Sequence, residues 1–263
     1  MKTIKKKLIL SISILAILFL ISGCMSTSYN VATGERETVF YSTDKEVKLG
    51  RKLARKLERK YKLLDDEQEQ KKIDRIGQRI AIVSDRQDLQ YHFSIIKDKE
   101  INALALPGGY IFISSGLINA ADSDDEIAAV LAHEVGHVAA YHSVKKMQGH
   151  FLYTFLKALT LTQKADRGFH RGSDFAYLSL VMQYSREFEK QADRLSVKYM
   201  KKAGFKPEAA LTMMDKLEEI DKKKPLRIYT YFKTHPPIAV RKAVIREAIT
   251  GKLDYEGYLN LNE

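Results

Sequence analysis

Residues 128–141 read AAVLAHEVGHVAAY, with His133 and His137 four positions apart. Positions i and i+4 of a helix share one face about one turn apart, so the two imidazoles can close on one metal ion. Glu134 falls beside that ion, where a carboxylate can take a proton from a coordinated water. The stretch therefore predicts a helix that holds a catalytic metal and that the rest of the chain serves.

The residues before this stretch predict where the helix begins. Asp124, Asp125 and Glu126 place negative charge in the first turn, where the helix dipole favours anions. Ser123 can cap the helix, with Glu126 as its capping-box partner. Ala, Val and Leu then recur at helical spacing, which favours a continuous helix through the motif.

The composition bounds the class of protein. With 263 residues, 45% of them hydrophobic and 29% charged, the chain is long and apolar enough for one sizeable core. The net charge of +11 suits anionic lipid heads or acidic polymers, although a solvated basic surface explains it as well. Cys24 is the only cysteine, so the chain can form no internal disulfide.

Residues 1–23 predict an export signal rather than a part of the fold. Several lysines open the chain, and the apolar run from Leu8 to Ser22 is shorter than the roughly 20 residues of a membrane span. The run ends in LISGC, which resembles a bacterial lipobox and implies cleavage before Cys24 and acylation of that cysteine. The alternative is an uncleaved N-terminal anchor.

Either form of this N-terminus predicts a protein outside the cytoplasm and tethered to a membrane. We expect the outer membrane, facing the periplasm, if the host has one, and otherwise the outer face of the plasma membrane. Export also argues against a nucleic-acid partner, despite the basic charge.

After the signal segment the sequence predicts a polar tether over residues 24–42 and a single domain over residues 43–263. Residues 43–61 space their apolar side chains as a basic amphipathic helix, whose cations can lie on a membrane surface or face solvent. Residues 164–173, which include two glycines, predict a loop that could move near the site as a lid.

A short β region precedes the metal helix. Residues 91–96 and 104–106 have strand patterns. The strongest strand pattern in the chain covers Tyr110, Ile111, Phe112 and Ile113. An open strand edge beside a metal helix can pair with an extended peptide, so we expect this last strand to be the edge that binds substrate. Helical patterns dominate elsewhere, and the predicted fold is α+β and mostly helical.

Two histidines leave a zinc ion short of ligands, since a catalytic site has three protein ligands and a fourth place for water. The pattern His-Glu-x-x-His-x-x-Gly-x-x-His would supply a third histidine, but Ala140 and Ser143 occupy the positions of its glycine and last histidine. His142 falls one residue short, and we expect it to pack in the interior or to face solvent.

A glutamate on a later helix is the second route to a third ligand. Glu189 has Asp193 four positions on, hence on the same face. Glu189 can bind the metal while Asp193 hydrogen-bonds a ligand histidine from behind and fixes its ring and tautomer. Glu187 is the rival ligand, but its neighbour four positions on is Gln191 rather than a carboxylate. An ordinary ion-paired helix surface is the structural alternative.

These motifs occur together in one known family. The matching stretches are residues 30–34, 46–50, 102–112, 133–137, 189–193 and 234–241. Together they resemble the HtpX and CAAX-prenyl-protease type of zinc metallopeptidase, most of all its bacterial envelope lipoproteins of the BepA and LoiP kind. The resemblance covers nearly all of the chain after the signal segment. It implies a zincin-like (gluzincin) domain with one Zn²⁺ ion.

Carried over residue by residue, the resemblance also implies roles. The implied zinc ligands are His133, His137 and Glu189, with Glu134 as catalytic base and Asp193 behind a ligand. His235 and Arg241 would face the site, where a cationic group can stabilise the developing oxyanion or hold the substrate. The alternative for His235 is a place near the metal in a resting state.

The predicted function is therefore that of a zinc-dependent endopeptidase. Its substrates would be extended, misfolded or unassembled envelope polypeptides, as in protein quality control. Two alternatives stay open: an envelope assembly factor or chaperone with a closed or vestigial site, and a zinc hydrolase acting on a non-peptide bond. No pattern in the sequence indicates the oligomeric state.

Overall fold

The structure is a computed structural model, and it describes residues 26–39, 41–161, 167–223, 235 and 240–254. The predicted signal segment and Cys24 lie outside these residues. In chain order the described elements are β1 (Ser26–Asn30), β2 (Glu35–Val39), α2 (Thr43–Lys60), α3 (Glu67–Ala81), β3 (His92–Ile96), β4 (Ala103–Leu106), η1 (Pro107–Gly109), β5 (Tyr110–Ser114), α4 (Ser115–Ala120), α5 (Asp124–Ala139), α6 (His142–Leu161), α7 (Arg167–Lys202), α8 (Ala209–Lys223) and α10 (Val240–Thr250).

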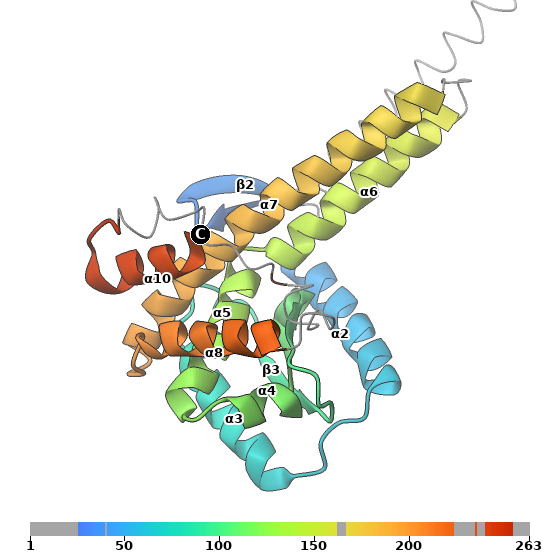
Figure 1. Ribbon diagram of the computed structural model, residues 1–263. Helices are drawn as coiled ribbons and strands as arrows, with labels where there is room; N and C mark the ends of the chain where they lie inside the picture. Colours follow the sequence, from blue (N-terminus) through green and yellow to red (C-terminus); the bar gives the residue numbers. More distant parts are fainter. Residues whose placement is uncertain (1–25, 40, 162–166, 224–234, 236–239, 255–263) are drawn as a thin grey trace, which may run out of the picture.

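The metal helix α5 lies in the middle of the protein (Figure 1). Every residue from Glu126 to Ala139 is buried, and a helix that is buried all round needs neighbours on every side. The helices α3, α7 and α8 and the strand β4 pack against it. The helix begins as expected, with the Ser123 hydroxyl accepting from the Glu126 amide at 3.2 Å. The Glu126 carboxylate reaches back one residue further than in a capping box, to the amide of Asp122.

The three-stranded sheet has the order β3-β5-β4, which corrects one prediction. β5, the strand expected to be the open edge at Tyr110–Ile113, lies in the centre. It pairs in parallel with β3 and antiparallel with β4, so its backbone has partners on both sides. Its pattern is strong because residues 111–114 are all buried, which is typical of a central strand and not of an edge.

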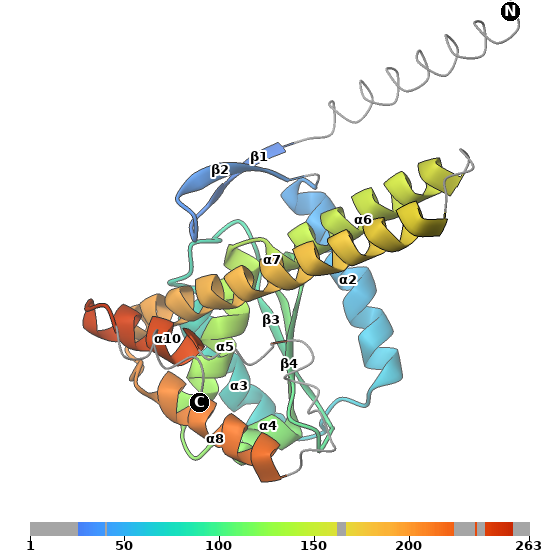
Figure 2. The ribbon, with the colours of Figure 1, turned by 45° about the horizontal axis from the view of Figure 1, so that its top comes forward.

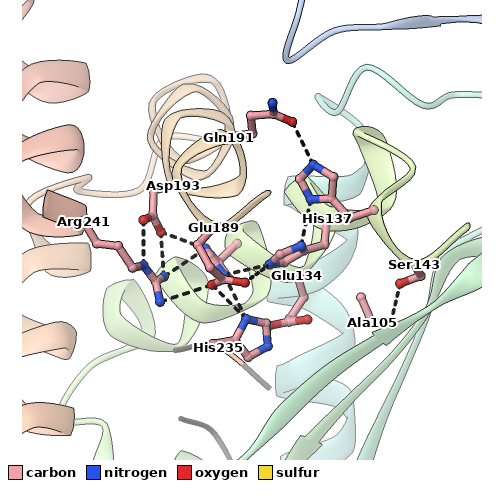
Figure 3. Close-up of polar contacts among 11 residues, drawn as sticks. Ala105, Glu134, His137, Ser143, Glu189, Gln191, Asp193, His235 and Arg241 are labelled. Atoms are coloured by element: carbon pink, nitrogen blue, oxygen red, sulfur yellow. Dashed lines mark hydrogen bonds and ion pairs between the residues drawn. The ribbon is translucent and has the colours of Figure 1, made fainter. Parts of the chain in front are cut away.

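The edge strand of this sheet that packs against α5 is β4. The Ser114 amide donates to the Asn102 carbonyl at 2.9 Å. Because antiparallel hydrogen bonds alternate along a strand, Ala103 and Ala105 turn their backbone groups away from β5. The Ser143 hydroxyl at the start of α6 donates to the Ala105 carbonyl at 2.9 Å, in agreement with this register (Figure 3).

α2 is fixed on the turn between β4 and β5. The buried Glu46 carboxylate accepts from the Gly108 amide at 2.9 Å and from the Arg86 guanidinium at 3.0 Å. Gly108 has a φ of +74°, which favours glycine. At Gly50 the helix approaches so closely that an added Cβ would lie 1.8 Å from the Pro107 carbonyl oxygen. The contact leaves no room for a side chain at this position of α2.

α6 and α7 run side by side as a long helical pair that leads away from the rest of the protein (Figures 1 and 2). α7 has 36 residues and is about 54 Å long at 1.5 Å per residue. The loop predicted over residues 164–173 is therefore wrong for residues 167–173, which are helical; residues 164–166 lie outside the described part. Two glycines suggested the loop, but a helix tolerates each at a cost of about 1 kcal/mol. No helix among the described residues combines the length and apolarity of a membrane span.

The segment predicted as a polar tether contains the hairpin β1–β2. Asn30, at the end of β1, is buried and donates to the Glu37 carboxylate at 2.8 Å. Glu37 also forms an ion pair with Lys145 of α6. Apolar contacts also attach the hairpin: Val31 and Ala32 of its turn pack against the core, and Val39 is buried. These few apolar residues form no regular hydrophobic pattern in the sequence.

Candidate metal centre

α5 supplies the first three residues of the site. His133 and His137 lie one turn apart, as their spacing predicts, with their Nε2 atoms 3.0 Å from each other. Glu134 is 1% exposed, and its Oε1 lies 3.2 Å from His235 Nε2. Neither oxygen of this carboxylate accepts a hydrogen bond from the described residues.

α7 brings Glu189 to the two histidines, because it packs closely on α5. Gly136 lies between the histidines, where an added Cβ would be 3.0 Å from the Ala192 carbonyl oxygen. The Glu189 carboxylate is fully buried. Its Oε2 is 3.2 Å from His133 Nε2, and its Oε1 is 3.4 Å from His137 Nε2. Glycine at position 136 therefore allows α5 and α7, the two helices that carry the site, to approach this closely.

His235 is the fourth member of the group and comes from the segment before α10. Its Nδ1 lies 3.3 Å from His133 Nε2 and 3.1 Å from Glu189 Oε2. The ring is buried, and Figure 3 shows it close to both Glu134 and Glu189. The sequence alternative that places His235 near the metal agrees with this position.

The four side chains fit a single zinc ion. One ligand atom from each of His133, His137, Glu189 and His235 lies within 4.8 Å of all the others. The contacts given above are 3.0 to 3.4 Å long, and the edge of a tetrahedron with zinc bonds of 2.0–2.1 Å is about 3.3 Å. Imidazole and carboxylate are ligands that zinc accepts.

Asp193 and Arg241 lie behind the ligands. Asp193 Oδ1 is 2.9 Å from His133 Nδ1, so the carboxylate can hold this ring as the sequence predicts. Arg241 donates from Nε and Nη2 to the two Asp193 oxygens, both at 2.7 Å, and its Nη1 is 3.2 Å from Glu189 Oε2. The guanidinium therefore contacts Asp193, which supports a ligand, and Glu189, which is itself a ligand.

The pKa values of Glu189 and His137 suit ligands for a cation, whereas that of His133 does not. Burial would raise the pKa of the Glu189 carboxyl, but the histidines and Arg241 around it hold that pKa well below its ordinary value. Burial lowers the pKa of His137 to about 4. Burial would also lower the pKa of His133, but its hydrogen bonds to Asp193 and Glu189 outweigh burial and raise it to about 9. Zinc binding at His133 should therefore release a proton.

One pair of residues at the site was not recognised from the sequence. His142, expected to pack or to face solvent, is 1% exposed and hydrogen-bonds His137 from behind, with the two Nδ1 atoms 2.8 Å apart. Gln191 Oε1 is 2.9 Å from His142 Nε2. The spacing gave no signal, because the helix breaks between the histidines at Tyr141, whose φ is +59°.

Comparison with known proteins agrees with this geometry. Residues 67–249 match the sequence profile of Peptidase family M48. The chain belongs to peptidase family M48. This membership confirms the family resemblance. Among the described residues there is one zinc site, of the HExxH-plus-glutamate type, formed by His133, His137 and Glu189 with His235 beside them.

Three M48 relatives show how far the similarity extends. Mitochondrial metalloendopeptidase OMA1 of Schizosaccharomyces pombe is 30% identical over 178 residues, which are 66% of this chain and 51% of that protein. The Beta-barrel assembly-enhancing protease of Escherichia coli K12 is 26% identical over 186 residues, 67% of this chain and 38% of that protein. Metalloprotease YcaL of the same organism is 29% identical over 161 residues, 60% of this chain and 62% of that protein. The matched regions thus cover from 38% to 62% of the relatives' own lengths.

Proposed function

We propose that the protein is a zinc-dependent endopeptidase that hydrolyses peptide bonds in extended polypeptides. The observation that carries this proposal is the Glu134 carboxylate. It is buried beside a complete ligand group and accepts no hydrogen bond from the described residues. A buried carboxylate is costly unless hydrogen bonds satisfy it, and beside the 3.2 Å contact with His235 Nε2 a bound water can supply them.

The roles of the residues follow from their positions. Zinc bound by His133, His137 and Glu189 would supply Lewis acidity toward a substrate carbonyl and toward a water molecule, whose pKa falls to about 7. Glu134 accepts the proton of the attacking water and passes it to the leaving amine. His235 contacts Glu134 and the ligand group at once, so it must withdraw when substrate and water enter, and can then hold the oxyanion.

For Arg241 the positions favour support of the ligands over direct contact with substrate. Its three nitrogens lie on Asp193 and Glu189, both buried. Through Asp193 it fixes the His133 ring, and through Glu189 it balances the charge of the ligand group.

We assign the substrate edge to β4 in place of Tyr110–Ile113. The outward backbone groups of Ala103 and Ala105 can pair with an extended peptide by strand addition. The Ser143 hydroxyl occupies the Ala105 carbonyl and would have to turn away when a peptide binds. Strand addition selects extended segments, which favours misfolded or unassembled polypeptides as substrates.

We also propose that the protein is a lipoprotein, with residues 1–23 as signal peptide and an acylated Cys24 as membrane anchor. The support is the sequence LISGC after an apolar run. One relative is named a Beta-barrel assembly-enhancing protease, so envelope proteins that fail to assemble are reasonable substrates. A periplasmic location follows if the host has an outer membrane.

A second candidate is an assembly factor or chaperone in which the site stays closed. His235 favours it, because this residue completes the ligand group at 3.1 and 3.3 Å and so takes the place that a water needs. A protein closed in this way would bind unfolded chains along β4 without cleaving them.

Digestion of casein by the purified protein distinguishes these candidates. We expect cleavage that stops with a chelator and returns with added zinc. Glu134→Gln should abolish cleavage and leave zinc bound. The matched control is Glu187→Gln on the exposed side of α7, where the glutamate pairs with Lys190, and it should cleave normally. Zinc-loaded protein that binds casein without cutting it would instead establish the chaperone.

A further inference from the structure

His142 is a buried histidine that the mechanism above does not use. It begins α6 directly after Tyr141, whose left-handed backbone ends α5 and turns the next residue back toward the site. The ring stacks on Phe188, with centroids 4.1 Å apart and planes inclined by 12°. Its two nitrogens meet two polar groups, His137 on one side and Gln191 on the other.

The protons on this chain of contacts can be placed one by one. His137 turns Nε2 to the ligand group and must present a lone pair there, so its proton is on Nδ1. His142 Nδ1, 2.8 Å away, must then accept that proton's hydrogen bond. The proton of His142 is consequently on Nε2, which donates to Gln191 Oε1 at 2.9 Å. With His137 Nε2 kept as a metal ligand, this arrangement gives every N–H in the chain an acceptor.

We propose that His142, oriented by Gln191, is a positioning residue that fixes the tautomer and ring plane of the zinc ligand His137. The proposal rests on the zinc site and not on peptide cleavage, so zinc binding tests it even if the protein cleaves nothing. Among metal-binding histidines such an outer hydrogen bond typically changes affinity by about 10- to 100-fold.

The two ligand histidines are supported in different ways. His133 is held by Asp193, a carboxylate that Arg241 neutralises through two 2.7 Å hydrogen bonds. His137 is held by a neutral imidazole, which adds no charge to the site. Glu189 thus remains the one ligand carboxylate, and the bound cation keeps its ability to polarise a substrate.

Two substitutions separate this role from simple packing. Asparagine carries its amide oxygen one bond beyond Cγ, where histidine has Nδ1, so His142→Asn can still accept from His137. Glutamine is closer to histidine in size but carries its amide one bond further, near the Nε2 position, so His142→Gln fills the space without that acceptor. If His142 positions the His137 ring, His142→Asn should bind zinc more tightly than His142→Gln. If His142 only fills space, His142→Gln should bind zinc more tightly than His142→Asn.

The zinc dissociation constant of each variant, measured by competition with a chromophoric chelator, is the test. We expect His142→Asn to bind zinc within about threefold of the natural protein, and His142→Gln at least about tenfold more weakly. Thermal unfolding in excess EDTA shows that both variants fold without the ion. Equal affinities, or tighter binding by the Gln variant, would overturn the proposal.

Gln191 gives a second pair of variants outside the buried core. Gln191→Glu keeps an acceptor for His142 Nε2 and should retain zinc affinity. Gln191→Leu removes it, so the His142 proton can move to Nδ1 and confront the proton of His137. We expect about tenfold weaker zinc binding for the Leu variant. Identical affinities of these two variants would refute the part assigned to Gln191.

Discussion

Gly50→Ala tests how tightly α2 is fixed on the turn before β5. The added Cβ would lie 1.8 Å from the Pro107 carbonyl oxygen and 2.8 Å from its carbon, so helix or turn must move by more than about 1 Å. Both partners are backbone and cannot rotate away. Overpacking of this kind costs ~3 kcal/mol, and better helix propensity returns ~1 kcal/mol. The free energy of unfolding should therefore fall by about 2 kcal/mol.

Thermal unfolding followed by circular dichroism measures this loss. For a domain of this size, a loss of 2 kcal/mol lowers Tm by about 4–8 °C. The matched control is Gly149→Ala in α6, where an added Cβ meets no atom within 4 Å. That variant should unfold at the same temperature as the natural protein or a few degrees higher, because only helix propensity changes. If Gly50→Ala were as stable as Gly149→Ala, the close contact of α2 with Pro107 would be refuted.

Two further predictions concern buried or paired carboxylates. Asp193→Asn should weaken zinc binding by about 10- to 100-fold in chelator competition. It also leaves Arg241 without its anionic partner, so the free energy of unfolding in EDTA should fall by about 3 kcal/mol. Unchanged zinc affinity would contradict the support assigned to Asp193. Burial would raise the pKa of Asp85, but hydrogen bonds from Lys198 and Tyr199 keep that pKa below its ordinary value. The ionised carboxylate therefore stabilises the fold above about pH 4 and loses this effect as pH falls through the lowered pKa. Asp85→Asn should cost about 1–2 kcal/mol in urea unfolding at pH 7, with the difference shrinking below pH 4; a difference that persisted in acid would exclude the charge as its cause.

The metal helix could be predicted from the sequence because its signals are local. His133 and His137 are close in sequence, and a helix alone brings them together. Glu189 lies far along the chain, yet Asp193 four positions on indicated it as a ligand. Two acids at helical spacing can act as one metal ligand and one residue that hydrogen-bonds a ligand histidine. These residues meet in the structure as their spacing indicates.

The sheet order could not be predicted in the same way. Tyr110–Ile113 comes just before the metal helix and has the strongest strand pattern, but its central place depends on pairing with β3 and β4, which no local pattern records. The strand at the edge, β4, has only four residues, and its alternation of alanine and leucine is a weak strand pattern. Burial on both faces, which made β5 easy to recognise as a strand, was also evidence against an edge.

His142 shows the limit for the site. It missed the spacing of a third ligand by one residue, and its contact with His137 depends on the left-handed turn at Tyr141. A tyrosine rarely adopts that conformation, so nothing in the sequence indicated it. Gln191, the partner of His142, entered the sequence argument only because its place four positions after Glu187 made Glu187 a poor ligand.

The distribution of the site along the chain has a consequence for biosynthesis. A nascent polypeptide that has emerged only through α5 offers a cation two imidazoles and no carboxylate from α7, and His235 appears later still. The ligand group can therefore close only after α7 and His235 have both been synthesised. A shorter nascent chain lacks part of the ligand group and cannot hold the ion as the folded protein does.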